Sequence, residues 1–237
     1  GSVLVYDEGS YQIKKIDNKG VVTNFLGKAY NGGGETGDAS EARINLSSQG
    51  QMVADLSNGD VYWTSNNNIY KYDATSNSIS MLYDYGQQTR GIALYNNEVY
   101  FSGFYKYTIN KLTYDGSNYS HEVFIGNEDN ATYENDRGTQ KSFTDNFHYY
   151  PAELIVDQAR NKMYVNFYGI LDNWDYGRKR LVVVDFNSSS WMLHSDYNTT
   201  AEIPNNGRLS TAMLDKSTGN IFMAYDNNFR IFATDSN

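Results

Sequence analysis

The chain has 237 residues, of which 40% are apolar and 20 are glycine, so its composition is that of a globular protein and its length allows one large domain. The absence of cysteine excludes disulfides, thiolate metal ligands and a cysteine nucleophile. A formal net charge of −9 would repel a phosphate backbone or an anionic membrane, which argues against nucleic acid as a partner. No apolar run approaches the roughly 18 residues of a membrane-spanning helix, and residues 1–3 lack the features of a signal peptide, so we expect no direct membrane insertion.

The N-terminal segment predicts three short strands followed by a long loop. Apolar and β-branched residues gather at residues 3–6, 13–17 and 21–26, and polar residues separate these runs. Residues 27–46 form the loop, which is rich in glycine and polar side chains. The three strands fit the second, third and fourth places of a unit that recurs along the chain.

The next three units predict four strands each. In every unit a short apolar strand runs into a turn whose residues tolerate a positive φ, and a second strand follows at once. These first and second strands are predicted at residues 52–55 and 61–64, 92–95 and 99–102, and 154–157 and 163–166. The third and fourth strands are predicted at residues 69–73 and 79–83, 112–115 and 122–125, and 181–185 and 191–193.

The last unit predicts strands at residues 212–215, 221–224 and 229–232, without a fourth. No segment sustains a 3.6-residue periodicity, so the fold class is all-β. Repeated units of four short strands, each about 40 to 60 residues long, indicate β-propeller blades. About five blade-like units are recognisable and both terminal units are incomplete, which favours a five- or six-bladed ring. Residues 1–237 are therefore predicted to form a single β-propeller domain, alone or as part of a longer propeller or multidomain protein.

One stretch resembles a known repeat. Residues 34–46 read GETGDASEARINL and lead into QMVAD at 51–55 and GDVYW at 59–63. This order resembles the NHL repeat family, in which a Gly- and Asp-rich loop with a Ser/Thr-Glu-Ala segment precedes the first two strands of a blade. A weaker copy runs from residues 136–138 to 163–165, and YWTS at 62–65 resembles the YWTD repeat of related six-bladed propellers. By analogy with NHL-like propellers on exported bacterial lipoproteins, the resemblance implies a secreted, periplasmic or cell-surface protein.

All the long connections are predicted on one face of the propeller. Connections from strand two to three, and from strand four to the next blade, share a face, and they include residues 27–46, 103–108, 126–150, 168–179 and 195–208. Repeat proteins place their insertions on the binding face. Aromatic side chains there offer rigid contact surfaces with a polar end, although tyrosines also pack blades. The predicted ligand-binding residues are Tyr30, Tyr105, Tyr107, His148, Tyr149, Tyr150, Trp174 and Tyr176.

Acidic loops on the same face suggest a calcium site. Asp129, Asp172 and Asp175 supply hard oxygen donors, of which Ca²⁺ requires six to eight. Neither the loop that contains Asp129 nor the loop that contains Asp172 and Asp175 matches an EF-hand or a Ca²⁺-binding nonapeptide repeat. The alternative is therefore a set of solvated acidic loops. No other cofactor is expected.

The sequence gives little support for catalysis. The three histidines show no metal-ligand spacing, and no nucleophile elbow or phosphate loop is present. Asp17, Asp73, Asp115 and Asp185 end third strands, where Asp commonly caps a turn. We therefore expect a non-catalytic recognition module that binds a glycan, a peptide or a partner protein. The alternatives are a glycosidase or lyase with carboxylates in the central funnel, and an assembly subunit of a cell-surface complex.

Overall fold

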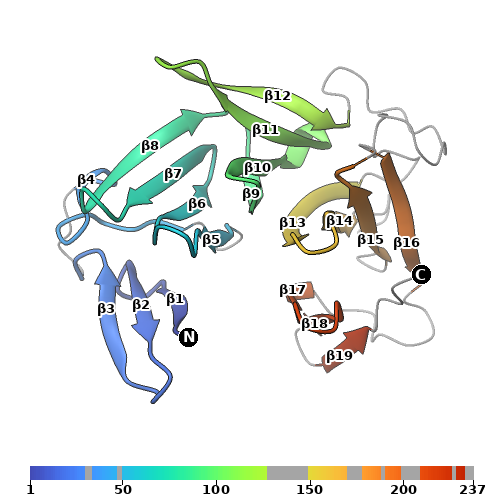
Figure 1. The fold of residues 1–237 in the computed structure, drawn as a ribbon, viewed down its shortest axis with the longest axis horizontal. Helices are drawn as coiled ribbons and strands as arrows, with labels where there is room; N and C mark the ends of the chain where they lie inside the picture. The colour runs from blue at the N-terminus through green and yellow to red at the C-terminus, as the bar shows by residue number, and fades with distance from the viewer. Residues whose placement is uncertain are drawn as a thin grey trace. The chain divides into compact units, whose positions relative to one another are not determined.

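The computed structural model describes residues 1–29, 34–46, 50–126, 149–169, 178–187, 190–198, 209–225 and 228–232. Within these ranges it contains nineteen strands in five antiparallel sheets and one short 3₁₀ turn (Figure 1). The chain divides into two compact units, residues 1–89 and residues 90–237, which are described separately. The prediction of a single domain therefore stays a prediction, whereas the prediction of an all-β chain is confirmed. In the described part of the chain no helix is long and apolar enough to cross a membrane.

The first unit contains two sheets. The first sheet has the order β1-β2-β3, with strands Val3–Asp7, Gln12–Ile16 and Val22–Leu26. The second has the order β4-β8-β7-β6-β5; its strands are β4 (Gly37–Asp38), β5 (Met52–Ala54), β6 (Val61–Ser65), β7 (Asn68–Asp73) and β8 (Ser78–Asp84). The short strand β4 lies in the stretch predicted as a loop and pairs with the outer edge of β8.

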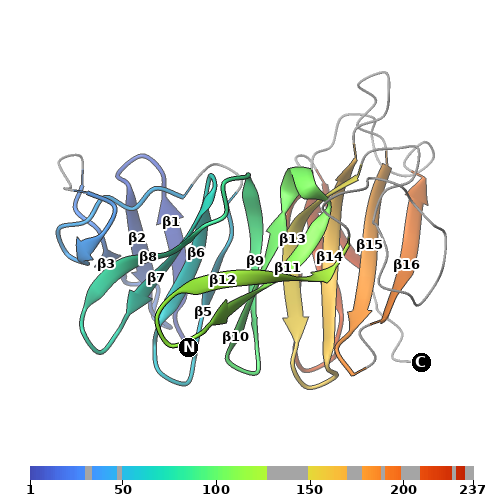
Figure 2. The same ribbon diagram turned by 90° about the horizontal axis from the view of Figure 1, so that it is seen from above.

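The second unit contains three sheets, and Figure 2 shows the strands of β13 to β16 side by side. The strands are β9 (Thr89–Tyr95), which begins at the boundary, β10 (Glu98–Gly103), β11 (Thr108–Tyr114), β12 (Tyr119–Ile125), β13 (Tyr149–Asp157), β14 (Lys162–Gly169), β15 (Arg178–Asp185), β16 (Ser190–Asn198), β17 (Leu209–Leu214), β18 (Ile221–Tyr225) and β19 (Asn228–Phe232). Each sheet pairs its strands in chain order. The 3₁₀ turn η1 (Phe104–Lys106) joins β10 to β11.

The turns after β2, β7, β11 and β15 share one structure. In each, an aspartate carboxylate accepts hydrogen bonds from backbone N–H groups two to four residues further along, at 2.8 to 3.0 Å. The four aspartates are Asp17, Asp73, Asp115 and Asp185. The prediction that they cap turns is confirmed, so their recurrence reflects the structural repeat.

A second recurring turn follows β5 and β17. Asp55 N donates to Asp60 O and Gly59 N to Asp55 O, while Asp215 N donates to Asn220 O and Gly219 N to Asp215 O. Strands β5 and β6 therefore take the same places in the repeat as β17 and β18. The shared turn after β2 and β7 likewise gives β2 and β3 the same places as β7 and β8. Among the described residues, the first sheet thus holds strands two to four of the repeat and the last sheet holds strands one to three, as predicted.

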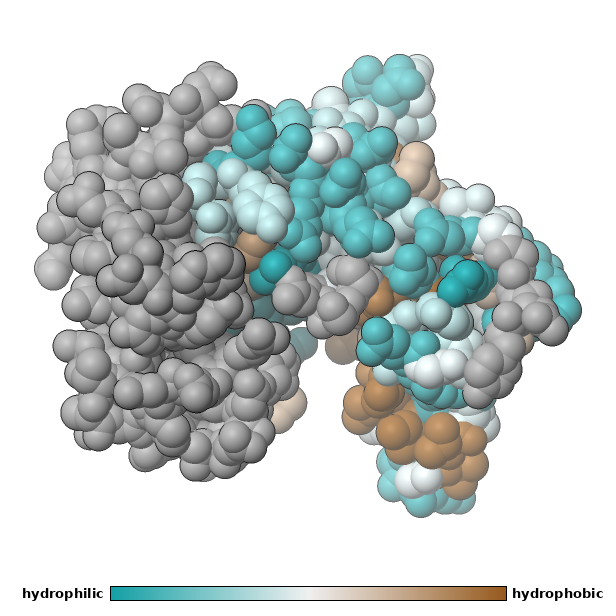
Figure 3. Space-filling model, turned by 180° about the vertical axis from the view of Figure 1, so that it is seen from behind, coloured by the Kyte–Doolittle hydropathy of each residue, from teal (hydrophilic) through white to brown (hydrophobic). Residues whose placement is uncertain are grey.

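The loop that resembles the NHL repeat packs into the core of the first unit. Ala39, Ala42, Ile44 and Leu46 are buried with residues of both sheets. Backbone hydrogen bonds from Gly27 N to Ala39 O and from Ile44 N to Tyr11 O hold the loop against the first sheet. By contrast, β-branched side chains on the other face of that sheet are exposed, and Figure 3 shows apolar surface gathered there.

In the second unit, the sheets around β9 and β13 approach closely. A Cβ on Gly91 would lie 2.7 Å from Ala152 O and 2.8 Å from Leu154 Cγ, so only glycine fits without a shift. Leu154 and Met163 pack in the buried core of this unit with Ile109 and Val184. This close contact fixes the position of β13 against the strand that carries residue 90.

Strands β13 to β16 are longer than predicted. Tyr149 pairs with Gly169 and Arg178 with Asn198, so the predicted loops 126–150, 168–179 and 195–208 are partly strand. The prediction that Tyr149 and Tyr150 lie in a loop is wrong. Pro151 explains part of this, because the residue before a proline favours an extended backbone. Ladder hydrogen bonds need only backbone groups, so the polar ends of these strands do not look like strands in the sequence.

Candidate functional site

The described aromatic candidates meet beside η1. Tyr107 ends the turn in a left-handed conformation, with φ 56° and ψ 36°, and sends the chain into β11. Such a backbone is strained for a bulky residue and often marks a functional position. Gly126 makes room for it, because a Cβ there would lie 2.4 Å from Tyr107 O and the φ of Gly126 is +107°. The result is a tight junction between Tyr107 and the residue that follows β12, and η1 also contacts β13.

A layered stack runs through this junction. The Arg90 guanidinium carbon lies 3.4 Å from the ring centroid of Phe104. Phe104 stacks on Tyr150 with centroids 4.6 Å apart and an interplanar angle of 23°. Tyr150 stacks in turn on Tyr107 at 5.1 Å and 18°. We call Arg90, Phe104, Tyr150 and Tyr107 the aromatic stack; Arg90 and Phe104 are buried in it.

Tyr105 stands edge-on to the aromatic stack. Its ring centroid is 5.0 Å from that of Phe104 at 75°, and 5.5 Å from that of Tyr150 at 83°. These edge-to-face contacts are favourable for aromatic pairs and restrict the ring to one orientation. With 53% of its surface exposed, Tyr105 offers solvent a rigid aromatic face.

The Tyr107 hydroxyl of the stack stays neutral at physiological pH. Burial raises the pKa of Tyr107, and a side-chain hydrogen bond with Tyr150 raises that pKa further. The raised pKa does not prepare Tyr107 as a base or a nucleophile, since both functions need a lowered pKa. The arrangement suits stacking and hydrogen bonding rather than proton transfer.

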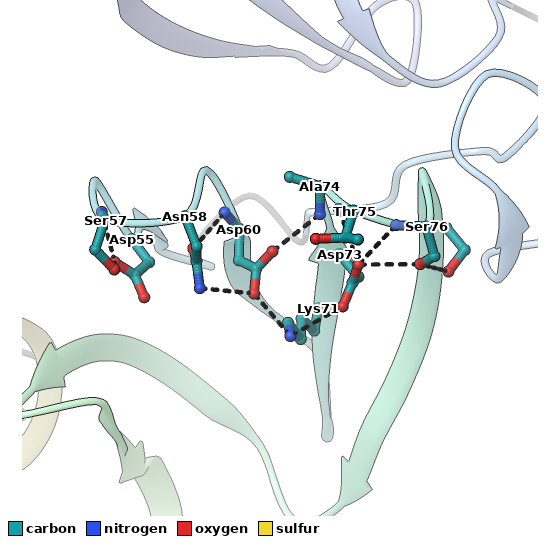
Figure 4. Close-up of polar contacts among 10 residues, drawn as sticks. Asp55, Ser57, Asn58, Asp60, Lys71, Asp73, Ala74, Thr75 and Ser76 are labelled. Atoms are coloured by element: carbon teal, nitrogen blue, oxygen red, sulfur yellow. Dashed lines mark hydrogen bonds and ion pairs between the residues drawn. The ribbon is translucent and has the colours of Figure 1, made fainter.

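The acidic residues of the first unit form a structural network (Figure 4). Buried Asp60 accepts hydrogen bonds from Ala74 N at 2.9 Å and Asn58 Nδ2 at 3.2 Å, and it pairs with Lys71 Nζ at 2.7 Å. Partial burial is the largest single influence on the Lys71 ammonium and disfavours it, yet the hydrogen bonds to Asp60 and Asp73 and the nearby charges together outweigh burial and raise the pKa of Lys71 overall. The contacts tie the turn after β5 to the turn after β7, so these charges stabilise the fold.

The structure brings some of the predicted site residues together, and others lie outside the described residues. Tyr105, Tyr107 and Tyr150 come together, and Tyr149 precedes Tyr150 in β13. Tyr30, His148, Trp174 and Tyr176 lie outside the described residues, as do Asp129, Asp172 and Asp175. No group of three or more His, Cys, Asp or Glu side chains that could hold a metal occurs in the part of the chain that is described. The calcium site stays a prediction.

Sequence reasoning missed Arg90. Its stacking on Phe104 joins positions that lie 14 residues apart in the sequence, on β9 and η1. The available signal was a basic residue at the start of an apolar strand, directly before Gly91. A charged side chain in a buried strand requires a partner. The face of an aromatic ring can be that partner, but sequence spacing does not reveal which ring it is.

Comparisons with known proteins show the fold. No family model matches the chain, and no curated protein matches it. Among solved structures, a chain of a nidogen–laminin complex matches 98% of this chain and 74% of its own length, with a TM-score of 0.63 and 11% identity. An auxiliary nutrient binding protein from Bacteroides thetaiotaomicron matches 95% of this chain and 54% of its own, with a TM-score of 0.52 and 11% identity.

A third match comes from the same bacterium. The extracellular domain of a protein described as a one-component system matches 99% of this chain with a TM-score of 0.53 and 11% identity, and this chain spans 26% of its length. The chain therefore covers about a quarter and about half of the two bacterial proteins that it resembles. Together with the repeated antiparallel sheets, these likenesses show that the chain has a β-propeller fold.

Proposed function

We propose that the chain is a non-catalytic binding module that recognises its ligand through Tyr105 and the aromatic stack beneath it. The observation that carries this proposal is the exposed face of Tyr105, held edge-on by Phe104 and Tyr150. A ring already fixed by packing loses little conformational entropy on binding, which is why tyrosine is frequent at recognition surfaces.

The ligand class is a glycan, a peptide or a partner protein. Sugar rings, prolines and apolar side chains all stack on a tyrosine face, and neutral hydroxyl groups donate and accept hydrogen bonds. The similar structures support this class, since one is a nutrient binding protein and one is a chain of a nidogen–laminin complex. Tyr30, His148, Tyr149, Trp174 and Tyr176 are further ligand contacts under this proposal, and Asp129, Asp172 and Asp175 its calcium ligands.

We place the protein at the bacterial cell surface, in the periplasm or outside the cell. The similar bacterial structures support this, since one is an extracellular domain and one a nutrient binding protein. An acidic chain without cysteine is compatible with these compartments. Fractionation of the native cells, with an antibody against the chain, measures where the protein is located. Recovery in the cytoplasm alone would contradict this location.

Binding to glycan and peptide arrays, with and without Ca²⁺, tests the function. A Tyr105→Ala variant is expected to lose at least about tenfold in affinity for any hit, since aromatic anchors carry about 2 kcal/mol or more of binding energy. Tyr114→Ala is the matched control, because Tyr114 is an exposed tyrosine of the same unit, on β11, outside the stack. Equal affinity of Tyr105→Ala and wild type would contradict the proposal. Cleavage of a bound glycan would favour the glycosidase alternative.

A further inference from the structure

The tight junction at Tyr107 has a counterpart in the first unit. Tyr107 and Tyr11 each directly precede a third strand of the repeat, β11 or β2, and both have a left-handed backbone, with φ 56° and 57°. The glycine after the fourth strand has a positive φ at both places. A Cβ on it would meet the carbonyl oxygen of the tyrosine, at 2.4 Å for Gly126 and at 2.9 Å for Gly27. The same strained junction therefore occurs twice in the chain.

At both junctions a guanidinium group lies over an aromatic ring. The guanidinium carbon of Arg90 lies 3.4 Å from the ring centroid of Phe104, and that of Arg43 lies 3.9 Å from the ring centroid of Tyr11. The two arginines differ in exposure, because Arg90 is buried and Arg43 is exposed. Arg43 forms no ion pair with any residue that the structure describes. Its charge is therefore held in place by the ring and is accessible to a ligand.

A guanidinium group held in this way suits a carboxylate. Contact with the ring covers one face of the planar group, and the N–H donors at its edge remain accessible. These donors match the oxygens of a carboxylate, which forms parallel, charge-assisted hydrogen bonds with them. Because the Tyr11 ring already restricts the Arg43 side chain, binding costs less conformational entropy than it does for an arginine without such a contact.

Polar side chains beside Arg43 suit hydroxyl groups. A backbone hydrogen bond from Arg43 N to Gly34 O, at 3.1 Å, places two segments of the loop side by side. Glu35 follows in one segment and Asn45 in the other, and both are partly exposed. Asn45 Nδ2 donates to Glu35 Oε1 at 3.2 Å, and the Tyr70 hydroxyl donates to Glu35 Oε2 at 2.5 Å. The amide and the carboxylate can accept hydrogen bonds from hydroxyl groups, whereas a carboxylate at Glu35 disfavours a phosphate or a second acidic group on the ligand.

We propose that Arg43 and its neighbours bind a uronic acid, which is a sugar ring that carries a carboxylate beside hydroxyl groups. The ligand carboxylate pairs with the Arg43 guanidinium, and the sugar hydroxyls form hydrogen bonds with Glu35 and Asn45. The formal net charge of −9 disfavours a polyanion, so we expect one uronic acid within an otherwise neutral glycan. The site lies in the first unit and uses neither Tyr105 nor the aromatic stack, so it goes beyond the function proposed above.

Isothermal titration calorimetry of the full chain tests the proposal with two probes. One is a xylotriose that carries one glucuronic acid, and the other is the methyl ester of the same sugar, which is uncharged. Wild type is expected to bind the acid and to bind the ester at least about tenfold more weakly, because the charge-assisted hydrogen bonds are lost. Arg43→Gln should lose the same factor for the acid. Arg43→Lys keeps the charge without the paired donors, so its affinity should lie between those of Arg43→Gln and wild type.

Lys19→Gln is the matched control, because it removes one positive charge from an exposed side chain at the other end of β2. It should bind the acid like wild type, and unchanged circular dichroism will show that all variants fold. Absence of binding between wild type and the acid at millimolar concentration would overturn the proposal. Equal affinity of wild type for the acid and the ester, or equal affinity of wild type and Arg43→Gln for the acid, would also overturn it.

Two further outcomes separate this site from the alternatives. If an acetylated peptide with one glutamate binds through Arg43 and the sugar acid does not, the ligand is an acidic peptide and the proposal is wrong. If Tyr105→Ala loses affinity for the sugar acid and Arg43→Gln does not, the sugar binds at the aromatic stack. That result would overturn the present proposal and leave the proposed function intact.

Discussion

Two regions of the chain, residues 55–76 and residues 104–107, use their side chains in opposite ways. Around residues 55–76 the carboxylates, the Lys71 ammonium and the backbone N–H groups satisfy one another between two turns. Around residues 104–107 rings and a guanidinium stack on one another, and Tyr105 keeps an open face. Charges that are engaged by the fold stabilise it, whereas a rigid ring left partly exposed is available to a ligand. The aspartates around residues 55–76 therefore serve the fold.

The largest effect is expected from Asp60→Ala in the first region. The change removes the closer acceptor of Lys71 Nζ and the acceptor of Ala74 N, which leaves a partly buried ammonium with Asp73 alone, at 3.4 Å, and a backbone donor without this partner. Breaking a buried ion pair on one side typically costs several kcal/mol, so we expect the free energy of unfolding to fall by about 3 kcal/mol. Urea denaturation measures it. Asp55→Ala, which removes only a local turn cap, is the control, and an equal loss in both would contradict the role of Asp60.

Gly91→Ala should perturb the aromatic stack through the contact between β9 and β13. The added Cβ would meet Ala152 O and Leu154 Cγ, which forces β9 away from β13. Overpacking of this kind costs about 2 kcal/mol. Because Arg90 precedes Gly91 and Tyr150 lies on β13, the aromatic stack should loosen as well, which near-ultraviolet circular dichroism detects. Gly9→Ala is the control, since its Cβ would meet only Asp7 Oδ1, at 3.5 Å. A native aromatic spectrum in Gly91→Ala would count against the geometry described.

Local features of the fold were predictable from the sequence, and the site was predictable only in part. Asp17 and Asp73 signal their turns within four residues, so the strands around them follow from local chemistry. Tyr105 and Tyr107 were predicted because they share one short connection. Arg90 and the strand position of Tyr150 depend on the contact of β9 and η1 with β13, about 50 residues away in the sequence. Such long-range packing leaves no periodic trace in the chain.

Tyr107→Phe tests the side-chain hydrogen bond between Tyr107 and Tyr150 in the stack. Loss of one partly buried hydrogen bond should lower the free energy of unfolding by about 1 kcal/mol at neutral pH. The pKa of Tyr107 is raised in the folded state by burial and then by Tyr150, so its stabilising contribution is present below the ordinary value near 10 and is lost as the pH rises through the folded-state value. Wild type should therefore lose melting temperature above about pH 10 more steeply than Tyr107→Phe. Parallel alkaline curves would contradict this.

The turn after β17, which contains Asp215, should lose stability at acid pH. This is the smallest of the expected effects. Side-chain hydrogen bonds from Ser217 and Thr218 lower the pKa of Asp215 from 3.8 to about 2. Because the folded-state value lies below the ordinary one, the contribution of this turn is present above about pH 4 and is lost as the pH falls through about 2. Asp215→Asn keeps an oxygen acceptor but does not titrate, so its melting temperature should fall less steeply than that of wild type between pH 4 and pH 2. If acid affects both proteins equally, the carboxylate is not what holds this turn, and the contrast between engaged charge and exposed ring loses one of its supports.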